Sequence, residues 1–544
     1  MIRSDLLVLG AGIAGCSAAL RAADLGADVV LVAKDPLGES NTAWAQGGII
    51  GLPPEEAGDS PALLAEDIER AGAGLCRPEA VALLAAQGPR LCRDFLWQRL
   101  GVPFDTGDRG EPEPTAEAAH SARRIFHVKD ATGLAIQRAL SEAARAHPRI
   151  RVLEGRMLVD LITSPHHWRD PRQVYDSMKC WGAYLFDEAG GGVEMALARR
   201  TILATGGLGY LYLHTTNPES ATGDGLAAAY RATVRIVNCE YMQFHPTSLY
   251  VPNKPRTLLT EALRGEGAHL VSRRGDRFMR RFHPDTMELA PRDQVSRAIF
   301  HELAATGEPC VYLDLAPVAA RLDLEARFPT VLAACRAEGI DPARQPIPVV
   351  PAAHYFCGGV LVDLDGRTSM DGLFAAGEVA CTGLHGANRL ASTSLLEGLL
   401  WGHRAAEAAV AECPSRPVPD AAGFAPWVVP PRMEEPDPLL IDQDWSQIRE
   451  TLWNYAGIVR TQARLERARE DMGYLYHRIE AFYRGSRLTR GLLELRSGII
   501  CARLILKAAQ LNPESRGCPY RVDQAVDGRG GLAYRAAIPR GRRS

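Results

Sequence analysis

The chain has 544 residues, more than one hydrophobic core usually contains, so two or three domains are expected. Hydrophobic residues make up 46% and charged residues 23%, which is the composition of a water-soluble globular protein. With 62 Lys and Arg against 65 Asp and Glu, the formal charge is −3, and no long run of like charge suggests a nucleic-acid partner. No apolar stretch approaches membrane-spanning length, so no membrane partner is expected.

The 12 cysteines are scattered, and none forms a Cys-x-x-Cys pair. This spacing argues against a zinc site or an iron–sulfur cluster, so no metal is expected. Scattered thiols fit a reducing compartment, and Met1 runs almost directly into the first expected strand, which leaves no room for a signal or transit peptide. The cytoplasm is therefore the expected location. Near the C-terminus, Arg540, Arg542 and Arg543 are interpreted as a solubilising tail.

The first residues predict a strand–turn–helix–strand unit. Residues 5–9 (DLLVL) form the apolar run of a buried strand, and a glycine-rich turn follows at once. Residues 18–25 are small and apolar, as in a helix that packs on a sheet, and residues 29–33 are expected to be the second strand. In this context a glycine turn is typical of dinucleotide binding.

The three glycines of the turn are expected to do different things. Gly10 allows the bend, Gly12 allows a phosphate to come close, and Gly15 lets the helix pack against the strand. The N-terminus of the helix then offers free N–H groups to a pyrophosphate.

The acidic residue that usually ends the second strand of such a unit is missing. Ala33 occupies its place and Lys34 follows. Ribose recognition must come from elsewhere, such as a backbone group or residues 40–42, and an ordinary NAD site is disfavoured.

The rest of the chain predicts a discontinuous first domain and two further units. Residues 201–204 and 372–376 are expected strands of the first domain, and the polar, irregular sequence between them is interpreted as an inserted domain. A Pro-rich stretch at 414–438 is expected to be an extended linker packed on the surface. Beyond it, apolar residues at helical spacing predict a small helical bundle. They are Ile448, Leu452, Tyr455 and Val459, and then Leu492, Leu495 and Ile499.

Several segments, in order along the chain, resemble the motifs of one superfamily. Flavin-contacting stretches of the fumarate reductase and succinate dehydrogenase flavoproteins are similar to residues 39–48 (ESNTAWAQGG), 204–207 (ATGG), 222–225 (TGDG) and 376–378 (AGE). Their substrate-side motifs are similar to residues 243–247 (QFHPT), 260–267 (TEALRGEG), 290–293 (APRD) and 385–389 (HGANR), followed by Ser392 and Ser394. Within the superfamily, the chain most resembles the L-aspartate oxidase family.

This resemblance implies an α/β fold with a discontinuous Rossmann-like FAD-binding domain, an inserted α+β capping domain and a C-terminal helical bundle. The expected boundaries are 1–237 and 351–413 for the FAD-binding domain, 238–350 for the capping domain, 414–438 for the linker, and 439–544 for the helical domain and tail. The implied activity is FAD-dependent oxidation of L-aspartate to iminoaspartate by hydride transfer to flavin N5. Dioxygen (giving hydrogen peroxide) or fumarate (giving succinate) would reoxidise the flavin. The resemblance places this reaction first in quinolinate and NAD biosynthesis, with a transient contact to quinolinate synthase.

The resemblance also implies which residues contact FAD, and that FAD is not covalently bound. Succinate dehydrogenases and complex-bound fumarate reductases link the flavin to a histidine where this chain has Asn41, and an amide cannot form that bond. The expected FAD contacts are Gly10, Gly12, Ile13, Ala14, Gly15, Lys34, Ser40, Asn41, Thr42, Gln46, Gly47, Gly48, Ala204, Thr205, Gly206, Gly207, Asp224, Glu378, Arg389, Ser392, Ser394 and Leu395.

Two arginines are the expected core of the substrate site. A dicarboxylate needs two cationic clamps, and guanidinium groups bind carboxylates in a bidentate, directional way, which points to Arg292 and Arg389. Arg292 is expected to position the substrate and stabilise charge more than to transfer a proton, because arginine stays protonated throughout the usable pH range. The remaining expected contacts are His245, His354, Thr260 and Leu258.

Glu117 is expected to recognise the amino group of the substrate. It matches an acidic residue of the L-aspartate oxidase pattern, where the dicarboxylate enzymes have an uncharged residue, and a carboxylate suits the ammonium group that succinate lacks. The alternative is a solvated loop acid, because Glu111 and Glu113 lie nearby.

Two other functions stay open at this point. One is a fumarate reductase or succinate dehydrogenase flavoprotein subunit, and the other is a non-catalytic flavin-binding protein.

Three positions also depart from the family pattern. Residues 118–119 (AA) replace two glycines, Thr393 stands where asparagine is common, and residues 518–520 (CPY) replace a histidine-containing run.

Overall fold

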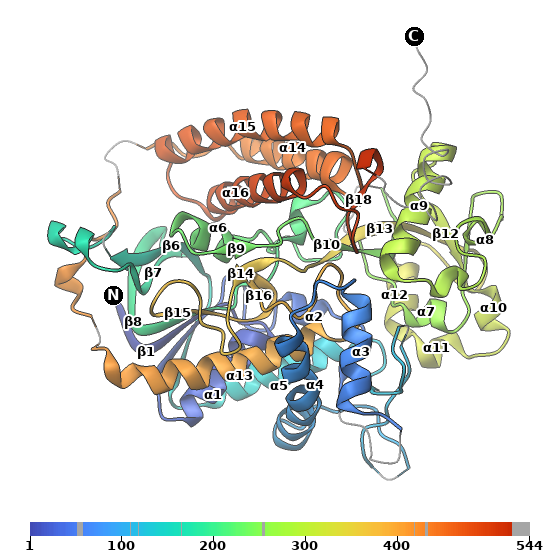
Figure 1. Ribbon diagram of the computed structural model, residues 1–544, viewed down its shortest axis with the longest axis horizontal. Helices are drawn as coiled ribbons and strands as arrows, with labels where there is room; N and C mark the ends of the chain where they lie inside the picture. Colours follow the sequence, from blue (N-terminus) through green and yellow to red (C-terminus); the bar gives the residue numbers. More distant parts are fainter. Residues whose placement is uncertain are drawn as a thin grey trace.

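A computed structural model describes residues 1–51, 58–108, 110–117, 119–164, 166–252, 256–417, 419–429 and 433–524. The basic tail, Ala118 and part of the Pro-rich stretch (Val418 and residues 430–432) lie outside the described residues. The chain forms three units, and Figure 1 shows the α/β part with a helical layer along one side and a mixed α/β lobe at one end. The predicted fold class is confirmed by the match to known structures reported below.

The α/β part is built on a seven-stranded sheet. Its order is β5-β2-β1-β8-β7-β6, and β15 also pairs with β8. The first strand lies centrally and is parallel to both neighbours, with Leu7 opposite Val30 on one side and Thr201 on the other. The strands are β1 (Ile2–Leu9), β2 (Val29–Val32), β5 (Ile150–Leu153), β6 (Arg156–Ser164), β7 (Lys179–Asp187), β8 (Gly192–Leu203) and β15 (Leu373–Ala375).

Helices α1 (Ile13–Asp24) and α13 (Ser394–Glu412) pack closely together beside the sheet. Ten of the twelve residues of α1 are buried, since its Ala, Gly and Ser side chains are small enough to allow close approach of α13. The helix predicted at 18–25 therefore begins five residues earlier, at Ile13 directly after the turn. Small residues on every face obscure the 3.6-residue period that would have located its start.

Shorter elements complete the α/β part. A three-stranded sheet of order β16-β14-β9 and a two-stranded sheet of β3 and β4 lie outside the large sheet. The remaining strands are β3 (Ile49–Ile50), β4 (Ile125–Phe126), β9 (Ile236–Val237), β14 (Gly359–Leu361) and β16 (Ala380–Cys381). The remaining helices are α2 (Asn41–Trp44), α3 (Pro61–Ala71), α4 (Pro78–Leu91), which continues as π-helix to Arg99, α5 (Thr132–Ala146) and α6 (Asp224–Arg231).

The inserted lobe has its own sheet and hydrophobic core. Its antiparallel strands have the order β10-β13-β12-β11, and they are β10 (Met242–Leu249), β11 (His269–Val271), β12 (Val311–Asp314) and β13 (Ile347–Phe356). Its helices are α7 (Ala262–Gly265), α8 (Met279–Phe282), α9 (Arg292–Thr306), α10 (Ala316–Ala319), α11 (Leu324–Arg327) and α12 (Pro329–Ala337). Strand β13 runs through the predicted boundary at 350/351 and pairs with β10 as far as Phe356. We therefore propose that the lobe ends after β13.

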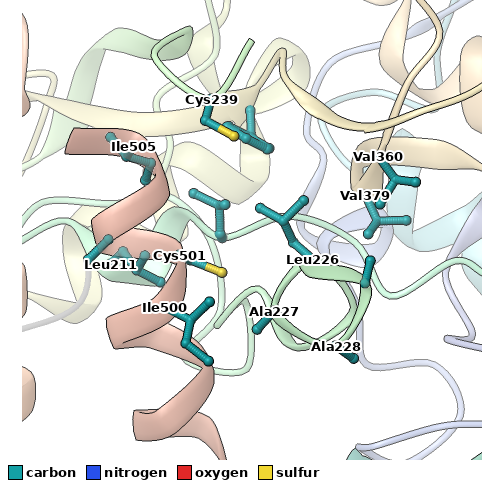
Figure 2. Close-up of a cluster of buried hydrophobic side chains, with 14 of the residues drawn as sticks. Leu211, Leu226, Ala227, Ala228, Cys239, Val360, Val379, Ile500, Cys501 and Ile505 are labelled. Carbon is teal, nitrogen blue, oxygen red and sulfur yellow. The ribbon is translucent and has the colours of Figure 1, made fainter. Parts of the chain in front are cut away.

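The C-terminal unit consists of three long helices that lie along the top of the molecule in Figure 1. They are α14 (Pro438–Ala456), α15 (Gln462–Gly485) and α16 (Arg490–Leu511). Figure 2 shows how α16 packs on the α/β part: Ile500, Cys501 and Ile505 face Leu226 and Ala227 of α6. The helical unit and the α/β part therefore share one buried hydrophobic cluster.

One residue of the predicted helical pattern is placed differently. Val459 is not part of α14, which ends at Ala456, but of β17 (Val459–Arg460), which pairs in parallel with β18 (Tyr520–Arg521). Gly457 interrupts the helix, and the partner strand lies 61 residues along the chain, where local spacing carries no information about it.

No helix of the described residues is long and apolar enough to cross a membrane. All 12 cysteines are free, and all except Cys76 are buried. In the described part of the chain, no group of three or more His, Cys, Asp or Glu side chains could hold a metal ion.

His403 predicts a loss of stability in mild acid. It lies in α13 with its ring edge-on to Phe95, 4.5 Å between centroids, and burial lowers its pKa from 6.5 to about 4. Between pH 6.5 and 4, His403 therefore binds a proton in the unfolded chain but not in the folded one. The free energy of unfolding falls as pH drops through this range, by at most about 1.4 kcal/mol per pH unit. Above pH 6.5 this group makes no further difference.

The measurement is chemical denaturation of wild type and His403→Leu between pH 4.5 and 7.5. The variant should be less stable at pH 7 but should show a shallower acid limb. The exposed His477 provides the matched control, since His477→Leu should leave the slope unchanged. An acid limb as steep in His403→Leu as in wild type would contradict the prediction.

Candidate functional site

One cavity runs from the glycine turn to the inserted lobe and collects nearly all the predicted site residues. All the predicted residues but one line it; they are Gly10, Gly12, Ile13, Ala14, Lys34, Ser40, Asn41, Thr42, Gln46, Gly47, Gly48, Glu117, Ala204, Thr205, Gly206, Gly207, Asp224, His245, Leu258, Thr260, Arg292, His354, Glu378, Arg389, Ser392, Ser394 and Leu395. The exception is Gly15, where a Cβ atom would lie 1.9 Å from the carbonyl oxygen of Gly10. Gly15 therefore makes the close contact within the turn, beneath the cavity.

The glycine turn leaves open space at the N-terminus of α1. Gly10 has a φ of +110°, and a Cβ there would lie 2.1 Å from the Ala204 carbonyl oxygen, so only glycine fits this crossing. Gly12 differs, since its φ of −73° suits any residue. Its absent side chain leaves room beside Thr42, whose hydroxyl accepts a hydrogen bond from Ile13 N at 3.0 Å. The helix N-terminus therefore presents an open, positive face to a phosphate.

Two buried polar atoms fit a bound flavin nucleotide. Gln46 and Thr205 line the cavity, and Gln46 Oε1 and Thr205 Oγ1 are buried without a hydrogen-bond partner among the described residues. Buried polar atoms are nearly always paired, so unpaired ones facing a cavity mark the place of a ligand. Together with the open face at Gly12, the residues present fit FAD.

Glu378 and Asn41 meet in the middle of the cavity. Asn41 Nδ2 donates to Glu378 Oε2 at 3.2 Å, and Phe356 N donates to Oε1 at 2.9 Å. Burial raises the pKa of Glu378 to about 7, so this carboxyl group titrates near neutrality. A Cβ at Gly207 would lie 2.2 Å from Glu378 Oε1, which explains the glycine at that position.

Lys34, next to the position of the missing strand-end acid, is a partly buried cation. Its Nζ lies 2.7 Å from Asp224 Oδ2 and 2.9 Å from Glu494 Oε1 of α16, and it donates to Ser220 O at 2.7 Å. Burial favours the neutral amine, but Asp224 and Glu494 outweigh it and raise the pKa of Lys34. An ion-pair cluster thus joins Lys34, in the wall of the cavity, to helix α16.

At the other end, Arg292 stands at the first turn of α9 between two carboxylates. Its Nε donates a short hydrogen bond to Glu261 Oε2, and its Nη2 lies 3.9 Å from Glu117 Oε1. Its Nη1 is buried without a hydrogen-bond partner in the described structure. Burial raises the pKa of Glu261, but Arg292 and Arg264 outweigh it and hold that pKa below its usual value. Arg292 is thus oriented by one carboxylate and keeps donors for another.

Two neutral histidines lie close together in the same part of the cavity wall as Arg292. The rings of His245, on β10, and His354, on β13, lie 5.4 Å apart at 64°. His245 Nδ1 lies 3.0 Å from Thr247 O, and His354 Nδ1 lies 2.8 Å from Thr216 Oγ1. Burial, reinforced by the nearby arginines, lowers both pKa values well below 6.5. Neutral imidazoles in this position can donate hydrogen bonds without adding charge.

Arg389 supplies the second buried cation. Its guanidinium stacks on the ring of Tyr355 at 4.8 Å, and its Nη1 donates to Ser394 Oγ at 3.2 Å. Its Nε has no partner in the part of the chain that the structure describes. Burial, and then the charge of Arg292, lowers the pKa of Arg389. Each guanidinium keeps an unpaired donor, Nη1 of Arg292 and Nε of Arg389, so together they could bind a ligand that carries two carboxylates.

Three residues of the site were missed from the sequence. Glu261 orients Arg292, Tyr355 supports Arg389, and Thr216 holds His354; all three line the cavity. Glu261 and Tyr355 stand next to Thr260 and His354, so adjacency to predicted residues was an available signal. No sequence signal marked Thr216, 138 residues from its partner.

Comparison with known proteins places the chain in a family. A family described as "FAD binding domain" matches residues 5–395, and one described as "Fumarate reductase flavoprotein C-term" matches residues 445–529. L-aspartate oxidase 1 of Ralstonia nicotianae is 43% identical over 521 residues (95% of each chain), and L-aspartate oxidase of Pseudomonas aeruginosa is 42% identical over 526 residues (95% of each chain). A structure of the quinol fumarate reductase from E. coli matches with a TM-score of 0.85 at 27% identity, over 96% of this chain and 92% of that one. The chain is therefore an FAD-binding flavoprotein and belongs to the L-aspartate oxidase family.

Proposed function

We propose that this protein uses bound FAD to oxidise L-aspartate to iminoaspartate, the first step of NAD biosynthesis. The observation that supports it most is one end of the cavity, where the partly buried guanidinium of Arg292 and the buried one of Arg389 line the same wall as the carboxylate of Glu117. Two cations match the two carboxylates of the substrate, and the carboxylate matches its ammonium group.

The side chains divide the work as follows. Bound flavin supplies the two-electron acceptor chemistry. Arg292 and Arg389 hold the two carboxylates and fix the carbon between them, and Glu261 prevents Arg292 from turning away. His245 and His354, kept neutral by burial, donate hydrogen bonds from the capping side and exclude water. Arg292 acts here by positioning and charge, because its guanidinium stays protonated. Thr260 and Leu258 line the same end of the cavity and are proposed as substrate contacts.

The decisive experiment follows the absorption of the flavin. Purified yellow protein should bleach under anaerobic conditions with L-aspartate, and air should restore the spectrum with release of hydrogen peroxide. Bleaching by succinate but not by aspartate would support the succinate dehydrogenase or fumarate reductase alternative instead. Bleaching by neither would leave a non-catalytic flavin-binding protein.

We also propose that the flavin is held without a covalent bond. Asn41 occupies the position of the histidine in the covalent relatives, and its amide is committed to Glu378. Acid precipitation should therefore leave the flavin in the supernatant, whereas flavin that stays with the pellet would disprove this proposal.

Glu117→Gln is expected to separate the two substrates. The amide cannot pair with the substrate ammonium, so kcat/KM for aspartate oxidation should fall about a hundredfold, whereas fumarate reduction should change less than about threefold, since fumarate carries no amino group. The exposed Glu113 is the matched control, and Glu113→Gln should behave as wild type in both assays. Equal losses with both substrates would mean that Glu117 does not read the amino group.

The electron acceptor of the reduced flavin, a protein partner and the cellular compartment are proposed as well. Dioxygen and fumarate are both proposed to reoxidise the flavin, and steady-state assays with each will rank them. Transient contact with quinolinate synthase would appear as co-sedimentation of the two purified proteins. A cytoplasmic location is proposed because all 12 cysteines are free thiols, as is usual in a reducing compartment.

A further inference from the structure

Glu117 is held by a side chain from a distant part of the chain. Ser392 Oγ donates to Glu117 Oε2 at 2.5 Å. The other carboxylate oxygen, Oε1, lies 3.9 Å from Arg292 Nη2 and 3.7 Å from the Cβ position that Gly47 leaves empty. One oxygen is thus occupied by Ser392 and the other is presented to the cavity, at the border between flavin-contacting and substrate-contacting residues.

The backbone on both sides of this hydrogen bond is strained. Ser392 has a φ of +58° and Ala119, two residues beyond Glu117, has a φ of +67°. Left-handed conformations are uncommon for residues other than glycine, and they persist where the surroundings impose them, often at functional sites. The left-handed backbone of Ser392 is therefore held in place by its surroundings, with the hydroxyl directed at Glu117.

His120 holds the peptide that precedes Ser392. Its Nε2 lies 3.1 Å from Ala391 O, and its Nδ1 lies 3.3 Å from Arg124 Nη1. Because a guanidinium only donates, Nδ1 must accept, and the single proton of the neutral ring is then on Nε2, pointing at Ala391 O. Arg124 is fixed by Asp67 Oδ2 at 2.7 Å, so this arm is anchored in the α/β part.

We propose that Ser392 and His120 are positioning residues for Glu117: they aim its other carboxylate oxygen, Oε1, at the amino group of the substrate and so set the preference for an amino dicarboxylate over a plain one. This inference rests on the proposed function, in which Glu117 meets the substrate ammonium. It also gives Ser392 a role other than the flavin contact expected from the sequence, because its hydroxyl proton is already committed to Glu117.

The first test compares Ser392→Ala with Ser392→Gly. Both remove the hydroxyl, but only glycine relieves the left-handed backbone. Both variants should raise KM for aspartate about tenfold, the worth of one hydrogen bond to a charged group, and leave KM for fumarate and the flavin Kd within about twofold. Ser446→Ala, on exposed α14 surface, is the matched control and should behave as wild type.

Three results would overturn the proposal. Wild-type behaviour of Ser392→Gly would assign the effect of Ser392→Ala to backbone strain alone. A parallel weakening of flavin binding, measured by quenching of flavin fluorescence, would make Ser392 a cofactor contact. Equal increases in KM for aspartate and fumarate would indicate a general loss of the site.

The second test uses His120. Glutamine can keep a donor near the place of Nε2, whereas phenylalanine keeps only the ring volume. His120→Phe should raise KM for aspartate about tenfold, and His120→Gln should stay within about threefold of wild type. If both variants lose equally, His120 acts by packing, and its part of the proposal fails.

A double-mutant cycle separates this inference from the proposed function. If Ser392 acts through Glu117, Ser392→Ala should add no further loss in KM for aspartate when Glu117 is already Gln. If Glu117→Gln fails to favour fumarate over aspartate, the amino-group assignment itself is wrong and the positioning proposal falls with it. If Glu117→Gln is selective but Ser392→Ala is not, only the positioning proposal is wrong.

Discussion

Replacing Arg292 by lysine should reduce kcat/KM for aspartate oxidation about a thousandfold, a loss of about 4 kcal/mol. Lysine keeps the charge, so the loss measures the fork geometry of the guanidinium. In the structure the fork is divided: Nε is taken by Glu261, Nη2 faces Glu117 and Nη1 is left for a ligand. An ammonium group has one centre and cannot satisfy Glu261 and a substrate carboxylate in these two directions.

The flavin of the Arg292→Lys protein should bind with unchanged Kd, because Arg292 belongs to the substrate end of the cavity. Activity is measured as peroxide release, and flavin binding by fluorescence. The exposed Arg274, also in the inserted lobe, is the matched control, and Arg274→Lys should stay within about twofold of wild type. If Arg292→Lys keeps more than about a tenth of wild-type activity, Arg292 is only a point charge.

Gly12→Val should weaken FAD binding more than about a hundredfold while the protein still folds. The φ of −73° at Gly12 is accessible to valine, so the backbone is not strained. A Cβ there would already lie 3.3 Å from Thr42 Oγ1, and the valine methyl groups would fill the open face at the N-terminus of α1. A pyrophosphate could then no longer approach the helix N–H groups.

Flavin Kd and far-ultraviolet circular dichroism together test this prediction. Gly192→Val is the matched control, since a Cβ at Gly192 meets nothing within 4 Å. Gly10→Ala gives the contrast, because a Cβ at Gly10 would overlap Ala204 O and should lower stability rather than flavin affinity alone. Normal flavin binding by Gly12→Val would place the phosphates elsewhere.

Features that depend on short stretches of sequence could be predicted. Local patterns predict the strand at β1, the turn at Gly10 and the helix after it, and the sequence motifs indicate the family and the cofactor. Element ends were less certain, as at Ile13, where α1 begins earlier than its apolar pattern suggests. The spacing of apolar residues places Val459 in a helix. The strand that it actually pairs with, β18, lies far along the chain, where this local spacing says nothing about it.

What the sequence alone determined is which reactive side chains the chain carries and in what order: the glycine turn at Gly10, the arginines Arg292 and Arg389 proposed as carboxylate clamps, and the carboxylate of Glu117 proposed for an amino group. Only the tertiary structure decided which of these groups meet. Ser392 reaches Glu117 across 275 residues, and Glu261 reaches Arg292 across 31. Hydrogen bonds act over about 3 Å in space, so a linear pattern can name the donors and acceptors, but packing of the domains decides their partners.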